Sequence, residues 1–476
     1  MAKKKSKKRS KKKALSSGSS GYDAIKSNGK RKPSSSVIKH EDVQLRGRDR
    51  RSMQSVGNDL HRNFSMVAWA VRRHLDYNTQ FNFQVRTEDE ALNEQIETLM
   101  SRWALPANCD ASGRMSLPQL IRMAETRHIL DGDFFFLKRR QGYLNAVEAD
   151  LIRNESESST EEEEGWYNGI KVNSDGRPLA YALHKRSGRG NYEFLRTINS
   201  RNIIHLCHYD RFDQVRGVSP LASAYNTFRD VYEGVDYALA KMKVEQLFAL
   251  VIHSNSASGT GEYTRNGDGT YDVDFGKGPV KLEMDQDDDA KFLSSDNPGT
   301  NTQEFLQLVL SMAIKALDLP INFLDESRTN FFGSRAAWML YDRSCTSKRG
   351  VVLEMLRRIT VWKLQQWILS GELDLPAGTT VLDLPFEWVH VGMPWWDPAK
   401  EIAGDVLAIQ AGLDNPYRIC KERGRGEFEE NLRKIAQAKQ RANELGVSLS
   451  FDVPEGTEDN EQDTQENIEY EDGDDD

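Results

Sequence analysis

The stretch GVSPLASAYNTFRDVYEGVDYALAKMKVEQLFALVI, residues 217–252, constrains this chain more than any other because it reads as one long helix. Ser219 is a typical N-cap, and Pro220 suits a first turn because the N–H that proline lacks would be unpaired there anyway. At 1.5 Å per residue, roughly thirty helical residues would reach about 45 Å. Such a helix needs neighbours along its whole length, so the stretch predicts a long core or coiled-coil helix.

The helix has one apolar face and one charged face, as expected of an amphipathic helix. Its apolar positions recur every three or four residues: Leu221, Ala224, Tyr225, Phe228, Val231, Tyr232, Val235, Ala238, Leu239 and Met242. Its charged positions are Arg229, Asp230, Glu233, Asp236, Lys241 and Glu245. The pattern predicts that the apolar face is buried.

Length and composition narrow the class of protein. A chain of 476 residues is long enough for two to four domains. No apolar run approaches the roughly 20 residues of a membrane helix, and the amino end lacks the apolar centre of a signal peptide. The four cysteines are far apart, which is typical of free thiols in a reducing cytosol. We therefore expect no export signal and no contact with a membrane.

The net charge of −9 hides a strong asymmetry. Residues 1–50 carry 17 Lys and Arg against 4 Asp and Glu, whereas residues 455–476 carry 12 acidic residues and no basic one. The middle of the chain is therefore left with about −10, which is unlike a protein that grips DNA through cations at phosphates. Both ends are predicted to be disordered, and the basic end could contact nucleic acid or an acidic partner.

Hydrophobic periodicity and turn signals predict an α+β fold that is predominantly helical. The first half is predicted to hold helices over Met53–Tyr77 and Glu88–Trp103, a helix opened by Ser116 and closed at 131–133, and strands over Phe81–Val85 and Phe134–Lys138. Residues 144–206 read as short strands, including a hairpin over 166–186. The second half is predicted to begin with a buried helix over Gln303–Leu317 and a helical region over Ser334–Ser370 with a possible break at Gly350. A strand is predicted at 381–389. Two further helices are predicted, from Glu401 to Gly412 after an Asp397 N-cap and over Phe428–Leu445 with its end at Gly446.

No motif in the chain marks a catalytic or metal site. His205, Cys207 and His208 offer three metal ligands in four residues, but on a strand His205 and Cys207 would share one face and His208 would take the other. No second ligand cluster with zinc-finger spacing accompanies them. We find no phosphate-binding loop, nucleophile elbow, HExxH pair or dinucleotide fingerprint. The sequence therefore predicts a structural or binding protein that is not an enzyme and has no cofactor and no metal.

Five stretches, taken in order, resemble the portal proteins of tailed bacteriophages, most closely the lambda-like portal family. They are RDRRSMQSVGNDLHRNFSMVAWAVRRHLDYN, IKVNSDGRPLAYAL, IIHLCHYDRFDQVRGVSPLASAYNTFRD, LPINFLDESRTNFFGSRAAW and WWDPAKEIAGDVLAIQAGLDNP. The resemblance covers roughly residues 46–446. The chain departs from the family at Phe331-Phe332-Gly333, where the family often has Tyr-Ser-Ser, and in its strongly charged ends.

The resemblance implies a portal fold with long stem helices, a small α+β clip insertion, a helical crown and disordered charged termini. In chain order it implies these boundaries: basic disordered arm 1–48, first part of the wing 49–143, clip 144–208, stem helix region 209–253, second part of the wing 254–371 with a tunnel loop near 284–303, crown 372–450, and acidic disordered tail 451–476.

The resemblance also implies a function. Members of this family form a ring, usually of twelve copies, at one capsid vertex of the virion, where double-stranded DNA is packaged and later ejected. The implied partners are further copies of the chain, the terminase large subunit, a head-completion adaptor and a major capsid or scaffold protein, with assembly in the host cytoplasm. The other interpretations are a helical capsid scaffold or adaptor and a metal-dependent DNA-processing enzyme.

Combined with the resemblance, the charge pattern predicts the residues that line the channel. A conduit must let a polyanion slide, and fixed cations would hold it in place. The residues expected to line or flank the channel are Arg229, Lys241, Lys243, Asp285, Asp287, Asp288, Asp289 and Lys291.

Overall fold

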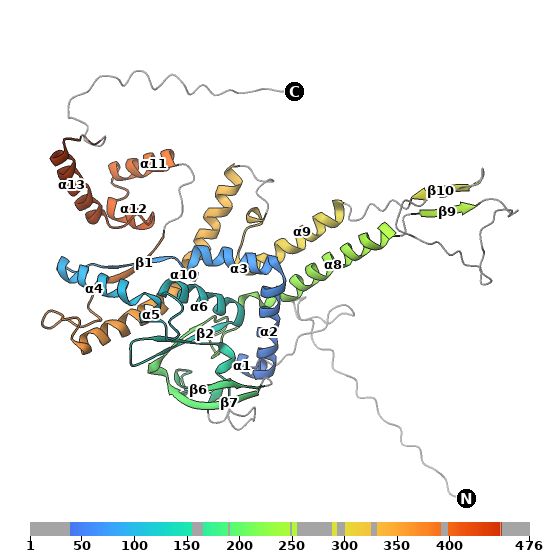
Figure 1. Cartoon of the computed structure of the whole chain (residues 1–476), viewed down its shortest axis with the longest axis horizontal. Helices are drawn as coiled ribbons and strands as arrows, with labels where there is room; N and C mark the ends of the chain where they lie inside the picture. The colour runs from blue at the N-terminus through green and yellow to red at the C-terminus, as the bar shows by residue number, and fades with distance from the viewer. Residues whose placement is uncertain are drawn as a thin grey trace, which may run out of the picture.

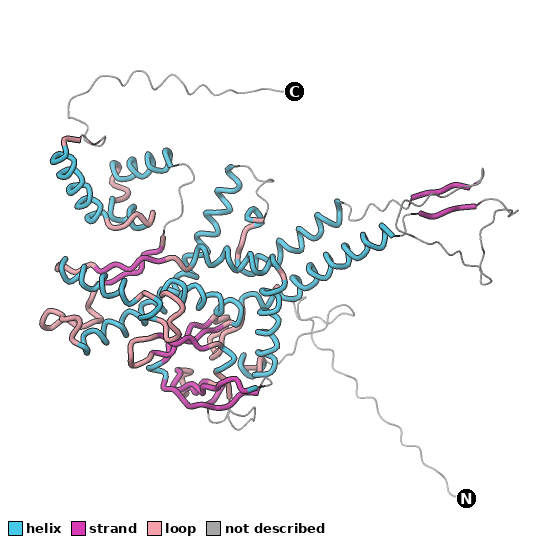
Figure 2. The backbone as a smooth tube through the Cα atoms, in the orientation of Figure 1, coloured by secondary structure: helices cyan, strands magenta, loops and turns pink. Residues whose placement is uncertain are grey.

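The computed structural model describes residues 39–154, 165–188, 191–247, 250–254, 288–292, 300–324, 331–391, 398–447 and 449. Within this part of the chain, helices form most of the body and small sheets lie between them (Figure 1, Figure 2). The predicted class, a predominantly helical α+β fold, is confirmed. No helix among these residues has the length and apolar content needed to cross a membrane.

The described chain opens with three helices, α1 (Glu41–Gln44), α2 (Gly47–Asn63) and α3 (Ser65–Asn78). The predicted single helix over Met53–Tyr77 is wrong at Phe64, where φ is −112° and ψ is 107°. Phe64 is buried, and its ring centroid lies 6.3 Å from that of Phe228 and 5.3 Å from that of Tyr232. Packing against a distant segment therefore overrides local helix propensity at this residue.

The last residues of the N-terminal segment that was predicted to be disordered, 1–48, are folded. This finding moves the predicted boundary toward the N-terminus. Residues 41–48 form α1 and the start of α2. Asp42 is buried there, and its carboxylate accepts hydrogen bonds from the backbone N–H of Val215 at 2.7 Å and of Arg216 at 3.2 Å. These contacts lie more than 170 residues away in the sequence, so local composition does not reveal them.

Helix α6 (Leu117–Asp131) and strand β2 (Asp133–Lys138) form the centre of the body. Ser116 and Gln119 make a capping box at the start of α6, and Gly132 ends the helix with φ of +87°. Both predicted ends of this helix are confirmed. Strand β2 pairs antiparallel with β3 (Leu144–Val147) on one side and with β8 (Ile203–Cys207) on the other.

A second, four-stranded sheet lies at the lower edge of the view in Figure 1. Its strands, in spatial order, are β4 (Trp166–Tyr167), β5 (Ile170–Val172), β6 (Pro178–Ser187) and β7 (Asn191–Asn199). The predicted hairpin over 166–186 is confirmed as the antiparallel pair β5 and β6. The pairing of β6 with β7 adds a strand that the turn signals did not predict.

The main apolar core lies between α6, β2 and two further segments that are distant in sequence. These segments are α4 (Glu90–Trp103), which is followed by the short α5 (Pro106–Cys109), and the long α10 (Phe331–Ser370). Strand β1 (Phe81–Val85) pairs antiparallel with β11 (Phe386–His390) beside this core. The predicted strand at 381–389 is confirmed only from Phe386 onward.

Helix α10 runs through Gly350 without a break, so the interruption considered for this position does not occur. A glycine inside a helix costs only about 1 kcal/mol relative to alanine, which core packing readily offsets. Leu356, Ile359 and Trp367 of this helix are buried in the core. Met339, near its N-terminal end, is 65% exposed.

The C-terminal helices form a small group at the upper left of Figure 1. They are α11 (Pro398–Gln410), α12 (Pro416–Glu422) and α13 (Phe428–Leu445). The predicted helices α11 and α13 are confirmed, and Gly446 closes α13 with φ of +67°. Asp397, the predicted N-cap of α11, lies outside the described residues. Arg423 links the group internally by ion pairs to Glu401 at 2.8 Å and Asp405 at 3.0 Å.

Candidate functional site

Two helices project from the body and lie side by side in Figure 1: α8 (Tyr225–Leu247) and α9 (Thr300–Ile314). We call α8 and α9 together the arm. The body end of the arm is made by two short 3₁₀ turns, Pro220–Ser223 before α8 and Lys315–Leu317 after α9. Toward its far end lie the paired strands β9 (Leu250–Ser254) and β10 (Asp288–Phe292).

The helix that was predicted over 217–252 is shorter in the structure. Ser219 is the expected cap, since its side chain accepts a hydrogen bond from Leu221 N at 3.1 Å. The capped segment is a 3₁₀ turn, however, and the α-helix begins at Tyr225 and ends at Leu247. The final Leu-Val-Ile of the stretch lies in β9 instead. Branched residues favour strands, and the antiparallel partner β10 supplies the hydrogen bonds.

Burial along α8 changes with distance from the body. Near the body, Tyr225, Phe228 and Val231 are buried against the second core cluster. Farther out, Tyr232 and Leu239 on the same apolar stripe are 38% and 48% exposed. The stripe predicted from the sequence therefore extends beyond what this subunit alone covers.

Helix α9 shows the same change more strongly, and the prediction that it is buried is only half right. Ala313 and Ile314 are buried next to the body. Phe305, Leu308 and Met312 are 62%, 53% and 59% exposed. Their spacing of three and four residues places them on one face, which we call the outer apolar row. Beyond the body α9 packs on α8 on one side, so an apolar residue on the outer side stays in solvent.

The three predicted channel cations on α8 are exposed, but they do not share one face. At about 100° per residue, Lys243 lies about 40° around the helix from Arg229, whereas Lys241 lies about 120° from Arg229. The side of the helix that carries Phe228 and Val231 faces away from Arg229. Arg229 and Lys243 therefore point to a common side, and Lys241 does not.

The predicted acidic channel residues are only partly described. Asp285 and Asp287 lie outside the described residues, as does most of the predicted tunnel loop 284–303. Asp288, Asp289 and Lys291 belong to β10, where the backbone pairs with Ser254, His253 and Val251 of β9. This part of the predicted loop is therefore a strand.

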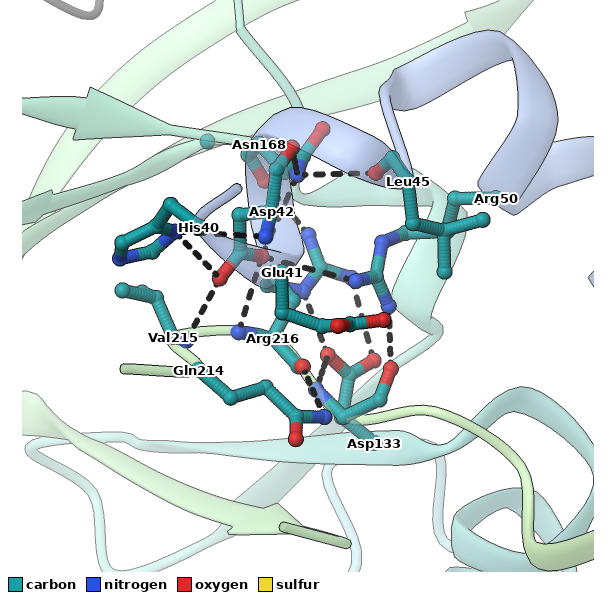
Figure 3. Close-up of polar contacts among 12 residues, drawn as sticks. His40, Glu41, Asp42, Leu45, Arg50, Asp133, Asn168, Gln214, Val215 and Arg216 are labelled. Atoms are coloured by element: carbon teal, nitrogen blue, oxygen red, sulfur yellow. Dashed lines mark hydrogen bonds and ion pairs between the residues drawn. The ribbon is translucent and has the colours of Figure 1, made fainter. Parts of the chain in front are cut away.

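The body end of the arm is held by a buried ion network around Arg216, shown in Figure 3. Arg216 is 1% exposed and donates from Nε and Nη2 to the Asp133 carboxylate at 2.5 and 3.1 Å. Its remaining donors reach the carbonyl oxygens of Ile152 at 2.7 Å, Asn168 at 2.6 Å and Ala149 at 2.9 Å. All five N–H groups of the guanidinium are thus used, and the side chain connects β2, the four-stranded sheet and the start of the arm.

The electrostatics of the network are those of a strongly coupled pair. Burial alone would disfavour the charge on either partner, yet Arg216 holds the pKa of Asp133 well below its ordinary value. The carboxylate in turn raises the pKa of Arg216 despite the burial of the guanidinium. Gly217 follows directly and donates its N–H to Asp133 at 3.2 Å. A Cβ at Gly217 would overlap the carbonyl group of Gly132, so glycine is required at this crossing.

Of the three residues that the sequence singled out as possible metal ligands, His205 and Cys207 lie in β8 and His208 lies just past its end. His205 stacks on Phe135 with ring centroids 4.4 Å apart and lies 3.8 Å from Asp133. His208 lies past the end of β8 and is 3.5 Å from Asp210. Among the described residues, no group of three or more His, Cys, Asp or Glu side chains is arranged to hold a metal ion.

Asp131, at the end of α6 beside the network, gives a pH-dependent prediction. Burial, with a smaller contribution from Asp133, raises its pKa to about 6. A carboxyl group with a raised pKa in the folded state favours folding when protonated, and this contribution is lost as pH rises from about 4 through 6. We therefore expect Asp131→Asn, whose amide oxygen can still accept from Asn58, to stabilise the protein at pH 8 by up to about 3 kcal/mol.

Urea unfolding at pH 5 and pH 8 would measure this effect. The gain should shrink at pH 5, where the wild-type carboxyl group is largely protonated. Asp175→Asn, in the exposed turn between β5 and β6, is the control and should give a small difference at both pH values. A gain for Asp131→Asn that is equal at the two pH values would contradict the assignment.

Comparisons with known proteins agree with one another. The family model described as phage portal protein, lambda family, matches residues 30–349. A relative described as a probable portal protein of Halomonas phage phiHAP-1 is 21% identical over 395 residues, which cover 75% of this chain and 72% of the relative.

The chain is also similar to a chain in the solved virion of a native gene transfer agent particle, with 14% identity, a TM-score of 0.45 and coverage of 79% of this chain and 93% of the other. Another is a chain from the neck of a native gene transfer agent particle computed with C12 symmetry, with 16% identity, a TM-score of 0.44 and coverage of 78% and 92%. Because the family model spans well over half of the sequence, this chain belongs to the lambda family of phage portal proteins, and its role is that of a head–tail connector.

Proposed function

We propose that copies of this chain, twelve in the capsid, form a ring at one capsid vertex and that double-stranded DNA enters and leaves the head through its axial channel. Apart from membership of the family, the observation that supports a ring is the set of exposed apolar residues on the arm. Phe305, Leu308 and Met312 on α9 and Tyr232 and Leu239 on α8 are all more than one third exposed. Large apolar side chains that are exposed together on one helix face, as Phe305, Leu308 and Met312 are, are typical of a protein interface.

A ring explains why this surface is left open in one subunit. In a cyclic assembly each subunit uses two different surfaces, one toward each neighbour, and every copy is buried on both sides. Residues 209–253, which include α8, would be the stem helix region of the portal. Residues 144–208 would be the clip, residues 49–143 and 254–371 the wing with its tunnel loop, and residues 372–450 the crown.

The charge of the chain supports a conduit in which DNA slides. The middle of each subunit carries about −10, and a ring multiplies this charge, so DNA would meet few strong binding sites. Arg229 and Lys243 face one side of α8, which fits a few cations near the channel and many acidic groups around them. Asp285, Asp287, Asp288, Asp289 and Lys291 would lie near the narrowest part of the channel.

The further partners follow from the proposed place in the particle. A ring at the vertex would receive the terminase large subunit during packaging and a head-completion adaptor afterwards. It would contact the major capsid or scaffold protein at its rim. Assembly would take place in the host cytoplasm before DNA enters the head.

Negative-stain electron microscopy of the purified full-length chain tests the proposal most directly. Rings with an axial hole are the expected result. Compact monomers at micromolar concentration, or solid particles without a hole, would overturn it.

The channel assignment makes a separate prediction for Arg229 and Lys243, which face one side of α8. The double variant Arg229→Glu with Lys243→Glu should lower DNA packaging in an in vitro assay by about two- to fivefold. An exposed charge interaction is worth about 0.5 to 1 kcal/mol, and each 1.4 kcal/mol is tenfold. The double variant Arg140→Glu with Lys315→Glu makes the same charge change at exposed positions of the body and should package normally. Equal packaging by both variants and the wild type would contradict the assignment.

A further inference from the structure

Three buried titratable side chains lie together near the body end of the arm: His74 on α3, and Glu125 and His128 on α6. They are 3%, 3% and 6% exposed, and we call them the buried histidine cluster. We propose that this cluster is an acid-sensitive contact, which holds the arm to the body at neutral pH and loosens when His74 takes up a proton. The proposal concerns the contacts within one subunit and does not depend on the proposed channel.

One carboxylate in the cluster faces two imidazole rings. Glu125 Oε2 lies 3.1 Å from His128 Nδ1, and Glu125 Oε1 lies 3.5 Å from His74 Nε2. The other ring nitrogen of His74, Nδ1, lies 3.5 Å from the hydroxyl group of Tyr341. One carboxylate balances one imidazolium, so the cluster is neutral when a single histidine is charged. A second proton would leave an uncompensated positive charge in a buried site, which is costly.

The surroundings decide which of the two histidines is charged. Burial alone would lower the pKa of His128, but the adjacent Glu125 carboxylate raises it above its ordinary value. Burial lowers the pKa of His74, and the nearby charge of Lys348 acts in the same direction. Burial would raise the pKa of Glu125, yet the two histidines hold it well below its usual range. His74 is therefore the neutral member of the cluster, and it is the one that becomes charged on acidification.

Lys348 on α10 connects the cluster to the arm. Its Nζ donates to the Leu317 carbonyl at 2.8 Å and pairs with Asp318 at 2.7 Å. These two residues end the 3₁₀ turn that follows α9, and Ser344 Oγ also donates to Asp318 at 2.8 Å. A positive charge on His74 would repel Lys348 and compete with it for Asp318. Protonation therefore weakens the contact that fixes α9 to the body.

A cavity of about 700 Å³ beside the cluster leaves room for such a movement. Its walls include the three residues of the cluster, Lys348 and residues of both 3₁₀ turns at the body end of the arm. The further groups that face the cluster are Asp133 on β2, Tyr341 on α10, Asp318 after the second turn and His208 after β8. Asp133 and Asp318 are paired with Arg216 and Lys348, so neither balances a second imidazolium.

The sign of the pH dependence follows from the lowered pKa of His74. An exposed histidine has a pKa of about 6.5. If opening of the contact exposes His74, the open state binds more protons than the closed state below this pH, so the closed state loses stability as the pH falls. His128 is protonated in both states in this range and adds no pH dependence. The equilibrium constant for opening should therefore rise by up to about tenfold per pH unit below about pH 6.5.

Hydrogen exchange of the full-length chain between pH 7.5 and 5.5, corrected for the intrinsic pH dependence of amide exchange, tests the proposal. In the wild type, the backbone amides of residues 221–224 and 317–319 should lose protection on acidification by up to about tenfold per pH unit. Amides of α4, in the main core, should not show this loss. His74→Gln should abolish the pH dependence at the two turns, because its amide group can replace the contacts of the ring and cannot be charged.

Glu125→Gln makes an opposite prediction, which a purely structural role of the cluster would not make. Without the carboxylate, burial lowers the pKa of both histidines, so each opening takes up two protons. The loss of protection at the two turns should then steepen toward about a hundredfold per pH unit. A dependence no steeper than that of the wild type would overturn the proposal.

His390→Gln is the matched control. His390 lies in β11 and does not line the cavity, and burial lowers its pKa as it does that of His74. This variant should keep the wild-type pH dependence at the body end of the arm. The proposal is overturned if the wild type shows no greater loss at the two turns than in α4, if His74→Gln retains the loss, or if His390→Gln removes it equally. Wild-type protection of α4 at pH 7.5 establishes that a variant is folded.

Discussion

Replacing Arg216 with methionine should lower the free energy of unfolding by about 3 to 5 kcal/mol, the usual result of removing one partner of a buried ion pair. The change would leave Asp133 as an uncompensated buried carboxylate. It would also leave the carbonyl oxygens of Ala149, Ile152 and Asn168 without their donors. In thermal unfolding, the loss should appear as a fall of roughly 3 to 5 °C in the midpoint, because a chain of this length has a large unfolding entropy.

A matched control exists on the protein surface. Arg186 also pairs with carboxylates, Glu148 and Asp150, but its side chain is 55% exposed. Arg186→Met should cost less than about 1 kcal/mol, since water competes for exposed ion pairs. The double variant Asp133→Asn with Arg216→Met should lose less than the sum of the single variants, because it leaves no unpaired charge. Equal stability of Arg216→Met and Arg186→Met would refute a holding role for the network.

Introducing charge into the outer apolar row should abolish the ring. The variant Phe305→Asp with Leu308→Asp places two carboxylates where the proposed interface buries apolar side chains. Each buried Phe or Leu contributes about 1.5 to 3 kcal/mol, and a buried carboxylate adds a desolvation cost. The loss at every interface corresponds to at least about a hundredfold weaker association, so size-exclusion chromatography with light scattering should find monomers.

The folded state of the monomer should be unaffected, since both residues are largely exposed in the single subunit. Gln303→Asp is the control. It adds a carboxylate to the same helix at an exposed position about 160° around from Phe305, and it should assemble normally. Rings formed by the double variant at wild-type protein concentration would show that the outer apolar row is not the interface.

Local signals predicted those elements that are determined by neighbours in the sequence. The start of α6 at Ser116, the ends of helices at Gly132 and Gly446, and strand β1 all follow from short-range sterics and hydrogen bonding. The family resemblance was likewise visible in the order of the quoted stretches. These features require few contacts with distant parts of the chain.

The errors occur where distant contacts decide the structure. Phe64 breaks a predicted helix because its ring packs near Phe228 and Tyr232 of the arm. The end of the predicted long helix becomes β9 because β10 is available as a partner. Helix α9 was predicted to be buried because its apolar residues lie around much of its circumference. The sequence pattern does not show whether the same chain covers these residues.

The Arg216 network was missed for the same reason. Asp133 and Arg216 are 83 residues apart, and Asp42 lies 174 residues from Arg216. Each stands in an ordinary local context, with Asp133 next to the end of α6 and Arg216 before a glycine. The Arg-Gly-Val-Ser-Pro stretch lies within one of the quoted family stretches, but it does not name the partner of the arginine.

For this protein, the sequence by itself determined the helical class, most element boundaries, the charge asymmetry and the portal family, because propensity, capping and composition act over short distances. Only the tertiary structure decided which apolar residues of the arm remain open, which charges share a side of α8, and which buried ions hold the arm to the body. These properties depend on which segments that are distant in sequence pack together, and one local sequence pattern is compatible with many such tertiary contacts.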